Sequence, residues 1–403
     1  MKSMIGFQEA LGLSLSRAPS TGAERLPVDR LAGRVLAEDL LARVDSPSAD
    51  VSLKDGYAVV SGDLSGAGEA NALRLAVLGS VQAGGAAEIR VQSGRALRIT
   101  TGAPIPEGAD AVLAEEYCRR EGDSIACFAP CEPGRNVLAR GADIAAGEPL
   151  ASAGELLSPP RVGLLAAAGL DSAPVGRRPR VGVVAIGDEV VAPGHPLPSG
   201  KLYASNQVEI GAWLAERGIA CRTAIVPDRE GEIGEALREL LPDIDALLTA
   251  GGAWSSERDL AVRVLEALGW EGIYHRVRMG PGKGVGFGLL EGKPVFCLPG
   301  GPPSCEMAFL QLALPALMAM QGQRAPGLPR LPARLAEAVE AQADWTEFFG
   351  ARLERRADGL WARPARRASR LQSMSMRDAL IVLPEGVRAL PDGAQIEVQV
   401  LRF

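Results

Sequence analysis

Residues 278–305 read RMGPGKGVGFGLLEGKPVFCLPGGPPSC, with a glycine at positions 280, 282, 284, 286 and 288 and one cation, Lys283, among them. A short apolar run ending at Leu298 follows. The loop 299–303 then leads into a segment that predicts a helix near 304–321. Glycines let backbone N–H groups approach a ligand closely, and a helix start presents unpaired N–H donors. The stretch therefore favours an anion-binding loop at the edge of a sheet, although the same glycines also suit plain turns.

Two common nucleotide-binding patterns do not describe this stretch. The P-loop pattern G-x-x-x-x-G-K-[ST] does not occur, and the glycines do not form a clean G-x-G-x-x-G fingerprint. A nicotinamide dehydrogenase on a doubly wound domain is therefore disfavoured.

The composition bounds the class of protein. The chain has 403 residues, 47% of them apolar, which is enough for the cores of more than one domain. A net charge of −6 argues against nucleic-acid binding. No run of 18 apolar residues and no signal-peptide pattern occur, so we expect no membrane span. Six cysteines without a pairing pattern indicate reduced thiols, and we expect a cytoplasmic protein.

Strand-like and helix-like segments alternate over residues 179–321. This alternation predicts a doubly wound α/β domain, whereas short runs bounded by Gly, Pro, Asp and Asn predict β-rich structure over 51–140 and 327–403. The last of these regions suits a small barrel or a sandwich. The predicted α/β strands are Val181–Ile186, Arg222–Val226 and Ala246–Thr249, and the predicted helices cover 206–218, 230–241 and 258–268.

Polar residues and glycines follow the predicted strands. In doubly wound sheets the carboxyl ends of the strands form the ligand site, so we expect these residues to converge on a phosphate-containing ligand. Carboxylate oxygens in such a setting suit Mg²⁺. The residues concerned are Asp188, Glu189, Asp228, Gly251, Gly252 and Lys283.

The order of several short motifs resembles the molybdopterin molybdenumtransferase family, which includes MoeA and the E domain of gephyrin. The resemblance covers nearly the whole chain. Its motifs stand here as Gly33-Arg-Val-Leu-Ala-Glu-Asp39, Asp55-Gly-Tyr-Ala58, Thr101-Gly-Ala-Pro-Ile-Pro106, Arg140-Gly-Ala-Asp-Ile144, Gly187-Asp-Glu189, Asn206, Gly251-Gly252 with Asp259, Pro281-Gly-Lys283 and Leu298-Pro-Gly300.

The resemblance implies a multidomain fold of class α/β and β. An elongated linker domain is expected over 1–46 plus 141–175, with a β-rich domain inserted at 47–140. A doubly wound, molybdopterin-binding α/β domain is expected over 176–325, and a small C-terminal β-barrel over 326–403. The family also implies a homodimer. Its active site lies between the α/β domain of one subunit and the small β-rich domain, at 47–140, of the other.

The resemblance further implies an enzyme of molybdenum cofactor biosynthesis. Such an enzyme takes adenylylated molybdopterin and molybdate, releases AMP and uses Mg²⁺. Other cofactor-biosynthesis proteins or a molybdoenzyme are expected as further partners, and the sequence does not show which protein accepts the product. Carried over position by position, the catalytic residues are Asp55 and Thr101 from the partner subunit with Glu189 and Asp259; the substrate-binding residues are Asp228, Gly251, Gly252, Lys283, Pro299, Pro302 and Ser369; and the Mg²⁺ ligands are Glu189, Asp228 and Asp259.

Some positions depart from the family pattern. Gly280 replaces the first lysine of Lys-Pro-Gly-Lys-Pro, Trp254 replaces a serine of the Gly-Gly loop, and Trp345 stands where the family carries an arginine suited to molybdate. Charged hydrogen bonds contribute roughly 1.5–3 kcal/mol each. A non-catalytic molybdopterin- or nucleotide-binding paralogue, acting as a scaffold or chaperone, therefore stays open as an alternative. Arg352 and Arg367 are candidate replacements for the lost cations, and the sequence does not separate molybdate from tungstate.

Overall fold

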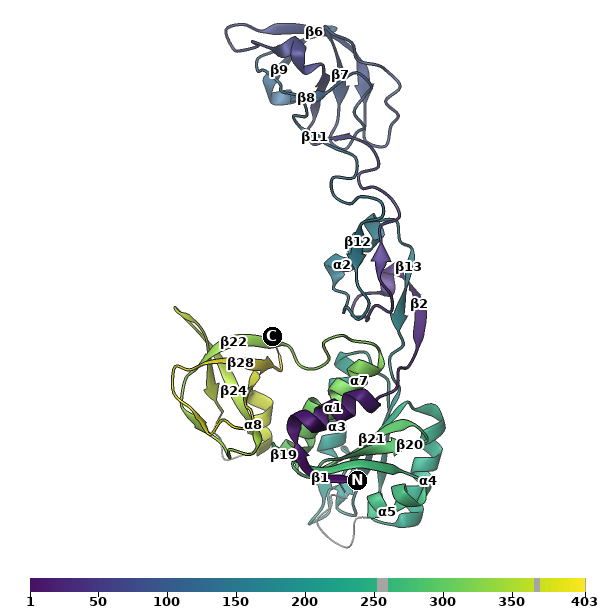
Figure 1. Cartoon of the computed structure of the whole chain (residues 1–403). Coiled ribbons are helices and arrows are strands. Elements are labelled where there is room, and N and C mark those ends of the chain that lie inside the picture. Colours follow the sequence, from purple (N-terminus) through teal and green to yellow (C-terminus); the bar gives the residue numbers. More distant parts are fainter. Residues whose placement is uncertain (252–259, 366–369, 403) are drawn as a thin grey trace.

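The structure, a computed structural model, describes residues 1–251, 260–365 and 370–402 (Figure 1). The chain is elongated. A β-rich domain stands at one end, and the α/β domain and the C-terminal β domain lie together at the other. A narrow group of strands and one helix joins the two ends, so residues of the β-rich domain lie far from the α/β domain of the same chain.

The α/β domain is built on apolar strands, and every residue of the central strand Val181–Ile186 is buried, as its continuous apolar run predicts. The parallel strands run in the order β17-β14-β18-β21, and β20 and β19 continue the sheet, with β20 antiparallel to both neighbours. The strand bounds are β14 (Val181–Ile186), β17 (Cys221–Val226), β18 (Ala246–Ala250), β19 (Glu271–Gly280), β20 (Gly286–Leu290) and β21 (Lys293–Leu298); the small pair is β15 (Val190–Val191) and β16 (Leu202–Tyr203).

The helices of this domain confirm the predicted strand–helix alternation. They are α3 (Ser205–Glu216), α4 (Glu230–Leu240) and α5 (Leu260–Ala267). In α4, Ile233, Leu237 and Leu240 form one buried face, because residues three and four apart lie on the same side of a helix. The doubly wound α/β fold class is therefore confirmed.

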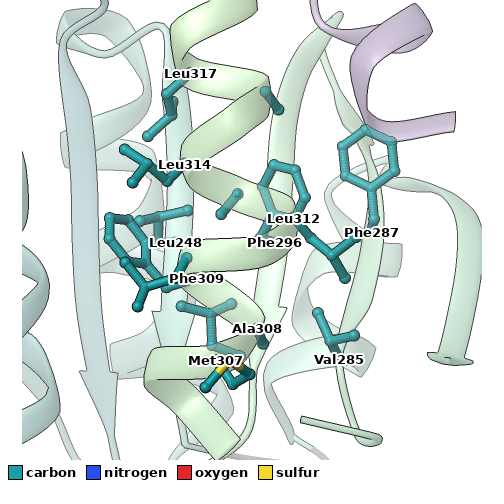
Figure 2. Close-up of a cluster of buried hydrophobic side chains, with 14 of the residues drawn as sticks. Leu248, Val285, Phe287, Phe296, Met307, Ala308, Phe309, Leu312, Leu314 and Leu317 are labelled. Atoms are coloured by element: carbon teal, nitrogen blue, oxygen red, sulfur yellow. The ribbon is translucent and has the colours of Figure 1, made fainter. Parts of the chain in front are cut away.

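One apolar helical segment forms the centre of the domain. It comprises α6 (Pro302–Ala308), a π-helical stretch (Phe309–Ala313) and α7 (Leu314–Met320). Figure 2 shows Phe309 and Leu312 of this segment among side chains of the sheet such as Leu248 and Phe296. By length and composition the segment could cross a membrane, but 83% of its apolar window is buried inside the protein. It is a core helix, apolar all round because protein surrounds it.

The N-terminal segment departs from the expected domain division. The sequence assigned residues 1–46 to the linker domain, yet β1 (Lys2–Gly6) pairs in parallel with β19, and α1 (Phe7–Arg17) packs its buried Phe7 and Ala10 into the α/β core. A short amphipathic helix gains more by covering this large apolar core than by standing on the narrow linker.

The linker consists of short paired strands and one helix around a core of its own. Its strands β2 and β13 pair, as do β3 and β12. The bounds are β2 (Ala23–Pro27), β3 (Leu40–Leu41), β12 (Pro149–Ala151), α2 (Pro159–Ala167) and β13 (Ser172–Gly176).

The β-rich domain is a six-stranded sheet in the order β8-β5-β7-β6-β10-β9, with a small pair β4–β11 beside it. The bounds are β4 (Val51–Ser52), β5 (Gly56–Val59), β6 (Leu73–Val81), β7 (Arg95–Ile99), β8 (Ala111–Ala114), β9 (Cys118–Glu121), β10 (Ser124–Cys127) and β11 (Val137–Leu138).

The C-terminal domain is the expected small barrel. Its strands close in the order β24-β25-β22-β28-β26, and β26 pairs back with β24. A parallel pair between β19 and β24 joins this barrel to the α/β sheet. The bounds are β22 (Arg330–Leu335), β23 (Val339–Glu340), β24 (Thr346–Arg356), β25 (Gly359–Pro364), α8 (Arg370–Met376), β26 (Ala379–Leu383), β27 (Ala389–Leu390) and β28 (Gln395–Val400).

Buried polar contacts also fasten the barrel to the α/β domain. Arg377 and Glu306 form an ion pair in which both side chains are more than nine-tenths buried. Gln311 and Gln399 exchange two amide hydrogen bonds of 2.7 and 3.1 Å in the same interface. Because such groups are costly to bury without partners, these pairs favour one relative placement of the two domains.

Substitution of Phe309 tests the role of the core helix. We expect Phe309→Ala to lower the unfolding free energy of the α/β domain by about 3–5 kcal/mol, because it leaves a cavity in a fully buried cluster. Chemical denaturation followed by far-ultraviolet circular dichroism measures the change. Val208→Ala is the matched control, since Val208 of α3 is 56% exposed and should change stability by less than about 0.5 kcal/mol. Equal effects of the two substitutions would contradict the assignment.

Candidate active site

The carboxyl ends of five strands meet at one edge of the α/β sheet. Strands β14, β17, β18 and β21 are parallel, and β19 runs in the same direction because β20 turns back between it and β21. Expected site residues follow each of these ends: Glu189 after β14, Asp228 after β17, Gly251 after β18, Lys283 after β19 and Pro299 after β21.

Three of the expected residues line one pocket of about 400 Å³: Glu189, Gly251 and Pro302. Gly251 has a φ of +101°, and a Cβ there would lie 2.3 Å from the backbone oxygen of Ile186. Only glycine fits this position, so backbone without a side chain lines the pocket at Gly251. A ligand can approach the main chain closely at this point.

Asn206 adds a polar group that the sequence did not assign to the site. The sequence predicted a cap-like helix start at Asn206, but α3 begins at Ser205 and receives no side-chain cap. The Asn206 amide instead donates to the oxygen of Gly300 at 2.8 Å. Within the described ranges its Oδ1 is buried without a hydrogen-bond partner. A buried acceptor of this kind is costly unless a donor, such as an N–H or O–H of a ligand, satisfies it.

The pocket has an apolar rim. Several of its lining side chains are large, apolar and strongly exposed, although such side chains are usually covered. One of them, Leu371, belongs to α8 and therefore comes from the C-terminal domain. The exposed rim residues are Leu197, Leu202, Tyr203 and Leu371. A mainly apolar lining with a few polar groups is typical of sites for small organic ligands.

Asp228 lies beside the pocket and is not part of its lining. Its carboxylate accepts a hydrogen bond from the backbone N–H of Asp188 at 3.3 Å, and the carboxylate of Asp188 accepts one from the N–H of Asp228, also at 3.3 Å. These reciprocal contacts tie the β14 and β17 loops together. They connect Asp228 to Asp188, the residue that precedes Glu189 in the chain.

The side chains in this region are hard oxygen donors, which are the ligands that Mg²⁺ prefers. Within the described residues, no group of three or more His, Cys, Asp or Glu stands close enough to hold a metal ion alone. Mg²⁺ commonly binds through one or two carboxylates together with substrate phosphates and water. Glu189 and Asp228 fit that role, and the third expected ligand, Asp259, lies outside the described residues, as do Gly252 and Ser369.

Part of the glycine-rich stretch forms a strand, whereas the sequence predicted an anion-binding loop. Gly286 and Gly288 lie in β20, and a Cβ at Gly288 would collide with Trp270 at 2.5 Å. Gly288 is therefore required for packing inside the sheet, and Gly286 is a strand residue. The helix start does not offer free N–H groups either: Pro302 and Pro303 have none, and the next two amides donate to the oxygen of Gly301 at 3.0 and 2.9 Å.

The turn that carries Lys283 remains a candidate anion site. Lys283 is exposed, and its ammonium nitrogen lies 5.3 Å from the ring centroid of Trp345. A Cβ at the neighbouring Gly284 would touch Pro299 at 3.8 Å, so this turn abuts the Pro299 loop. The same loop continues into Gly300 and Pro302 of the pocket.

Arg352, a candidate replacement for the lost cations, forms an ion pair away from the pocket. Its Nε donates to Asp378 at 3.1 Å in the C-terminal domain. The other candidate, Arg367, lies outside the described residues. The structure therefore gives no support to Arg352 as a substitute for the lost cations.

Asp55 and Thr101 lie together in the β-rich domain. The Asp55 carboxylate accepts hydrogen bonds from the backbone N–H of Thr101 at 2.6 Å and from its hydroxyl at 2.9 Å. The backbone N–H bond and then the hydroxyl bond hold the pKa of Asp55 below its ordinary value. A Cβ at Gly56 would lie 2.1 Å from the backbone oxygen of Leu113, so this tight strand start requires glycine.

These two residues do not join the pocket within one chain. In Figure 1 the β-rich domain and the α/β domain stand at opposite ends of the molecule. The structure thus sorts the described candidates into one group at the α/β edge and a separate pair, Asp55 and Thr101.

The fold and the pocket define a multidomain protein with a doubly wound ligand-binding domain, an inserted β-rich domain and a small C-terminal barrel. Family models match most of the chain: the MoeA N-terminal region (domain I and II) at residues 5–169, a probable molybdopterin binding domain at 182–319 and the MoeA C-terminal region (domain IV) at 332–401. The chain belongs to the molybdopterin molybdenumtransferase family, and it is an enzyme of molybdenum cofactor biosynthesis.

Individual relatives agree with this assignment. The chain is 31% identical over 379 residues to molybdopterin molybdenumtransferase 2 of Mycobacterium tuberculosis, covering 93% of this chain and 94% of that one. It is 33% identical over 326 residues to the Haemophilus influenzae molybdopterin molybdenumtransferase, covering 80% and 79%. A crystal structure of the molybdopterin biosynthesis MoeA protein from Pyrococcus horikoshii superposes with a TM-score of 0.82 at 32% identity, covering 99% of this chain and 100% of that one.

A pKa measurement tests the Asp55–Thr101 pair. Thr101→Val removes the hydroxyl bond but keeps the stronger backbone bond, so the pKa of Asp55 should rise only part of the way to its ordinary value. A depressed carboxyl pKa stabilises the fold above the unfolded-state pKa, and this stabilisation is lost as the pH falls through the folded pKa. In the variant, the folded-state and unfolded-state pKa values of Asp55 lie closer together. The pH range over which this stabilisation is lost is therefore narrower.

Carboxyl chemical shifts followed by NMR over an acid titration measure this effect. Asp45 is the internal control, because its pKa is lowered by the N–H of Ala146 and by Arg140 and should not move. An unchanged Asp55 pKa in the Thr101→Val protein would refute the role of the hydroxyl.

Proposed function

We propose that this enzyme inserts molybdate into adenylylated molybdopterin and releases AMP, in a Mg²⁺-dependent reaction in the cytoplasm. The observation that carries the proposal is the pocket at the strand ends, where Glu189, bare glycine backbone and the unsatisfied Asn206 Oδ1 lie together. Lys283 borders the same edge. Molybdate and the AMP phosphate are anions, so the reaction needs cations and N–H donors placed around them.

We assign a separate role to each group of site residues from its chemistry. Glu189 and Asp228, with Asp259, would hold Mg²⁺, which neutralises phosphate charge when bound. Gly251, with Gly252, lets the substrate lie against the main chain. Lys283 binds an oxyanion, and Pro299, Pro302 and Ser369 shape the pterin phosphate and molybdate pocket.

The active site is proposed to need two subunits. Asp55 and Thr101 form a preorganised carboxylate pair, but they stand at the far end of their own chain. In a two-fold homodimer each subunit's β-rich domain can face the other subunit's α/β domain. Asp55 then acts on the substrate held by the partner. Other cofactor-biosynthesis proteins or a molybdoenzyme are the proposed further partners.

A second candidate function is a non-catalytic protein that binds molybdopterin or a nucleotide as a scaffold or chaperone. The observation in its favour is Trp345, an uncharged side chain that stands beside Lys283 at the strand edge. This candidate predicts binding of the adenylylated ligand without release of AMP.

AMP release decides between the two. We expect the wild-type protein to form AMP from adenylylated molybdopterin when Mg²⁺ and molybdate are present, and to stop when EDTA removes the metal ion. Asp55→Asn and Lys283→Gln should each lower the rate roughly ten-fold or more, since each removes a charged contact. Lys2→Gln is the matched control, because it removes an exposed cation that pairs with Glu9 on the surface.

Mixed dimers test the shared site. A dimer of one Asp55→Asn subunit and one Lys283→Gln subunit holds one intact site and one doubly altered site if each site spans two subunits. We expect it to recover about half of the wild-type rate. Two inactive sites in the mixed dimer would place the whole site within one chain, and tight binding without AMP in the wild type would favour the scaffold function.

A further inference from the structure

Lys283 and Trp345 form a cation–π pair between two domains. The ammonium nitrogen lies 5.3 Å from the indole centroid, within the roughly 6 Å at which such attraction acts. Lys283 belongs to the turn after β19 in the α/β domain. Trp345 directly precedes β24 of the C-terminal barrel. Neither domain alone makes this contact.

Backbone hydrogen bonds and strand pairing hold the segment that carries Trp345. The N–H of Trp345 donates to the oxygen of Gln342 at 3.1 Å, and the next residue, Thr346, is the register partner of Met279 in the parallel β19–β24 pair. Arg278 donates through Nε to the oxygen of Asp344 at 3.1 Å. The β19–β24 pair therefore places the indole ring of Trp345 beside the end of β19, where the turn with Lys283 begins.

Among the residues that the structure describes, no acid forms an ion pair with Lys283. Across residues 1–251, 260–365 and 370–402, the structure has no carboxylate within ion-pair distance of its ammonium. A carboxylate at the start of β24, that of Glu347, instead accepts the N–H of Gln342 at 3.0 Å. The next basic residue along β19, Arg278, pairs with Glu385 at 3.4 Å. In the described part of the chain, the ammonium of Lys283 therefore contacts the indole ring of Trp345 and can bind another anion.

We propose that Trp345 is a positioning residue for oxyanion binding at Lys283. The indole face holds the flexible lysine chain toward the Pro299 loop, so that the ammonium meets a tetrahedral oxyanion such as molybdate or tungstate at the edge of the pocket. This inference rests on the proposed function, in which Lys283 binds the oxyanion. It adds that an aromatic ring from the C-terminal domain orients the cation.

Titration with tungstate tests the inference. Isothermal titration calorimetry gives the dissociation constant of the full-length protein and its variants. We expect Trp345→Ala to weaken binding roughly two- to five-fold, the range of an exposed cation–π contact, and Trp345→Phe to restore most of the affinity. Lys283→Gln should lose measurable binding. Trp361→Phe is the matched control, because it alters a cation–π pair with Arg356 elsewhere in the same barrel and should leave tungstate affinity unchanged.

Tryptophan fluorescence gives a second readout that a purely structural role would not produce. An oxyanion that binds Lys283 changes the surroundings of the Trp345 ring, so tungstate should shift or quench the wild-type emission. The change should be absent in Trp345→Phe and in Lys283→Gln but present in Trp361→Phe.

The outcomes separate this inference from the proposed function. If Trp345→Ala binds tungstate as tightly as wild type while Lys283→Gln does not bind, the positioning role is overturned and the oxyanion role of Lys283 stands. If the wild-type protein binds no tungstate, both the positioning role and the oxyanion role fail. Release of AMP by the wild type, measured independently, would then still support the transferase reaction through other residues.

Discussion

The burial of one apolar helix is the constraint on which the rest of the structure depends. The segment Pro302–Met320 is surrounded by the sheet, by α1 and by elements of the C-terminal barrel, and nearly every side chain from Cys305 onward is buried. Its first residue lines the pocket, and its buried Glu306 pairs with Arg377 of the barrel. The pocket, the core and the domain interface are therefore set by the same nineteen-residue segment. Loss of one partner of the ion pair would leave a buried charge, which typically costs about 3–5 kcal/mol.

The continuous sheet is the second organising feature. Because β19 pairs with β24, the α/β domain and the barrel share one set of strands, and no hinge separates the two at this point. The shared sheet brings the Lys283 turn and Trp345 to one edge. It also explains how α8 of the barrel reaches the pocket with Leu371. Residues of both domains line the candidate pocket, although the C-terminal domain contributes only Leu371 to the described lining.

The β-rich domain is organised differently. It joins the remainder through the narrow linker alone, and its Asp55–Thr101 pair is rigid without help from the α/β domain. In the proposed homodimer, another subunit would present a substrate to this preformed carboxylate. The elongated shape and the position of this pair are the observations that support the proposed site between subunits.

The sequence by itself determined the fold class and the family. Strand–helix alternation from Val181 onward, and the order of short motifs from Gly33 to Leu298, reflect local periodicity and turn chemistry, which each segment carries in its own residues. Only the tertiary structure decided that residues 2–17 cover the α/β core, that Asn206 turns to Gly300, and that Lys283 meets Trp345. These contacts depend on which distant segments pair and pack, and that choice is made by burial and strand register over the whole chain, which no local pattern records.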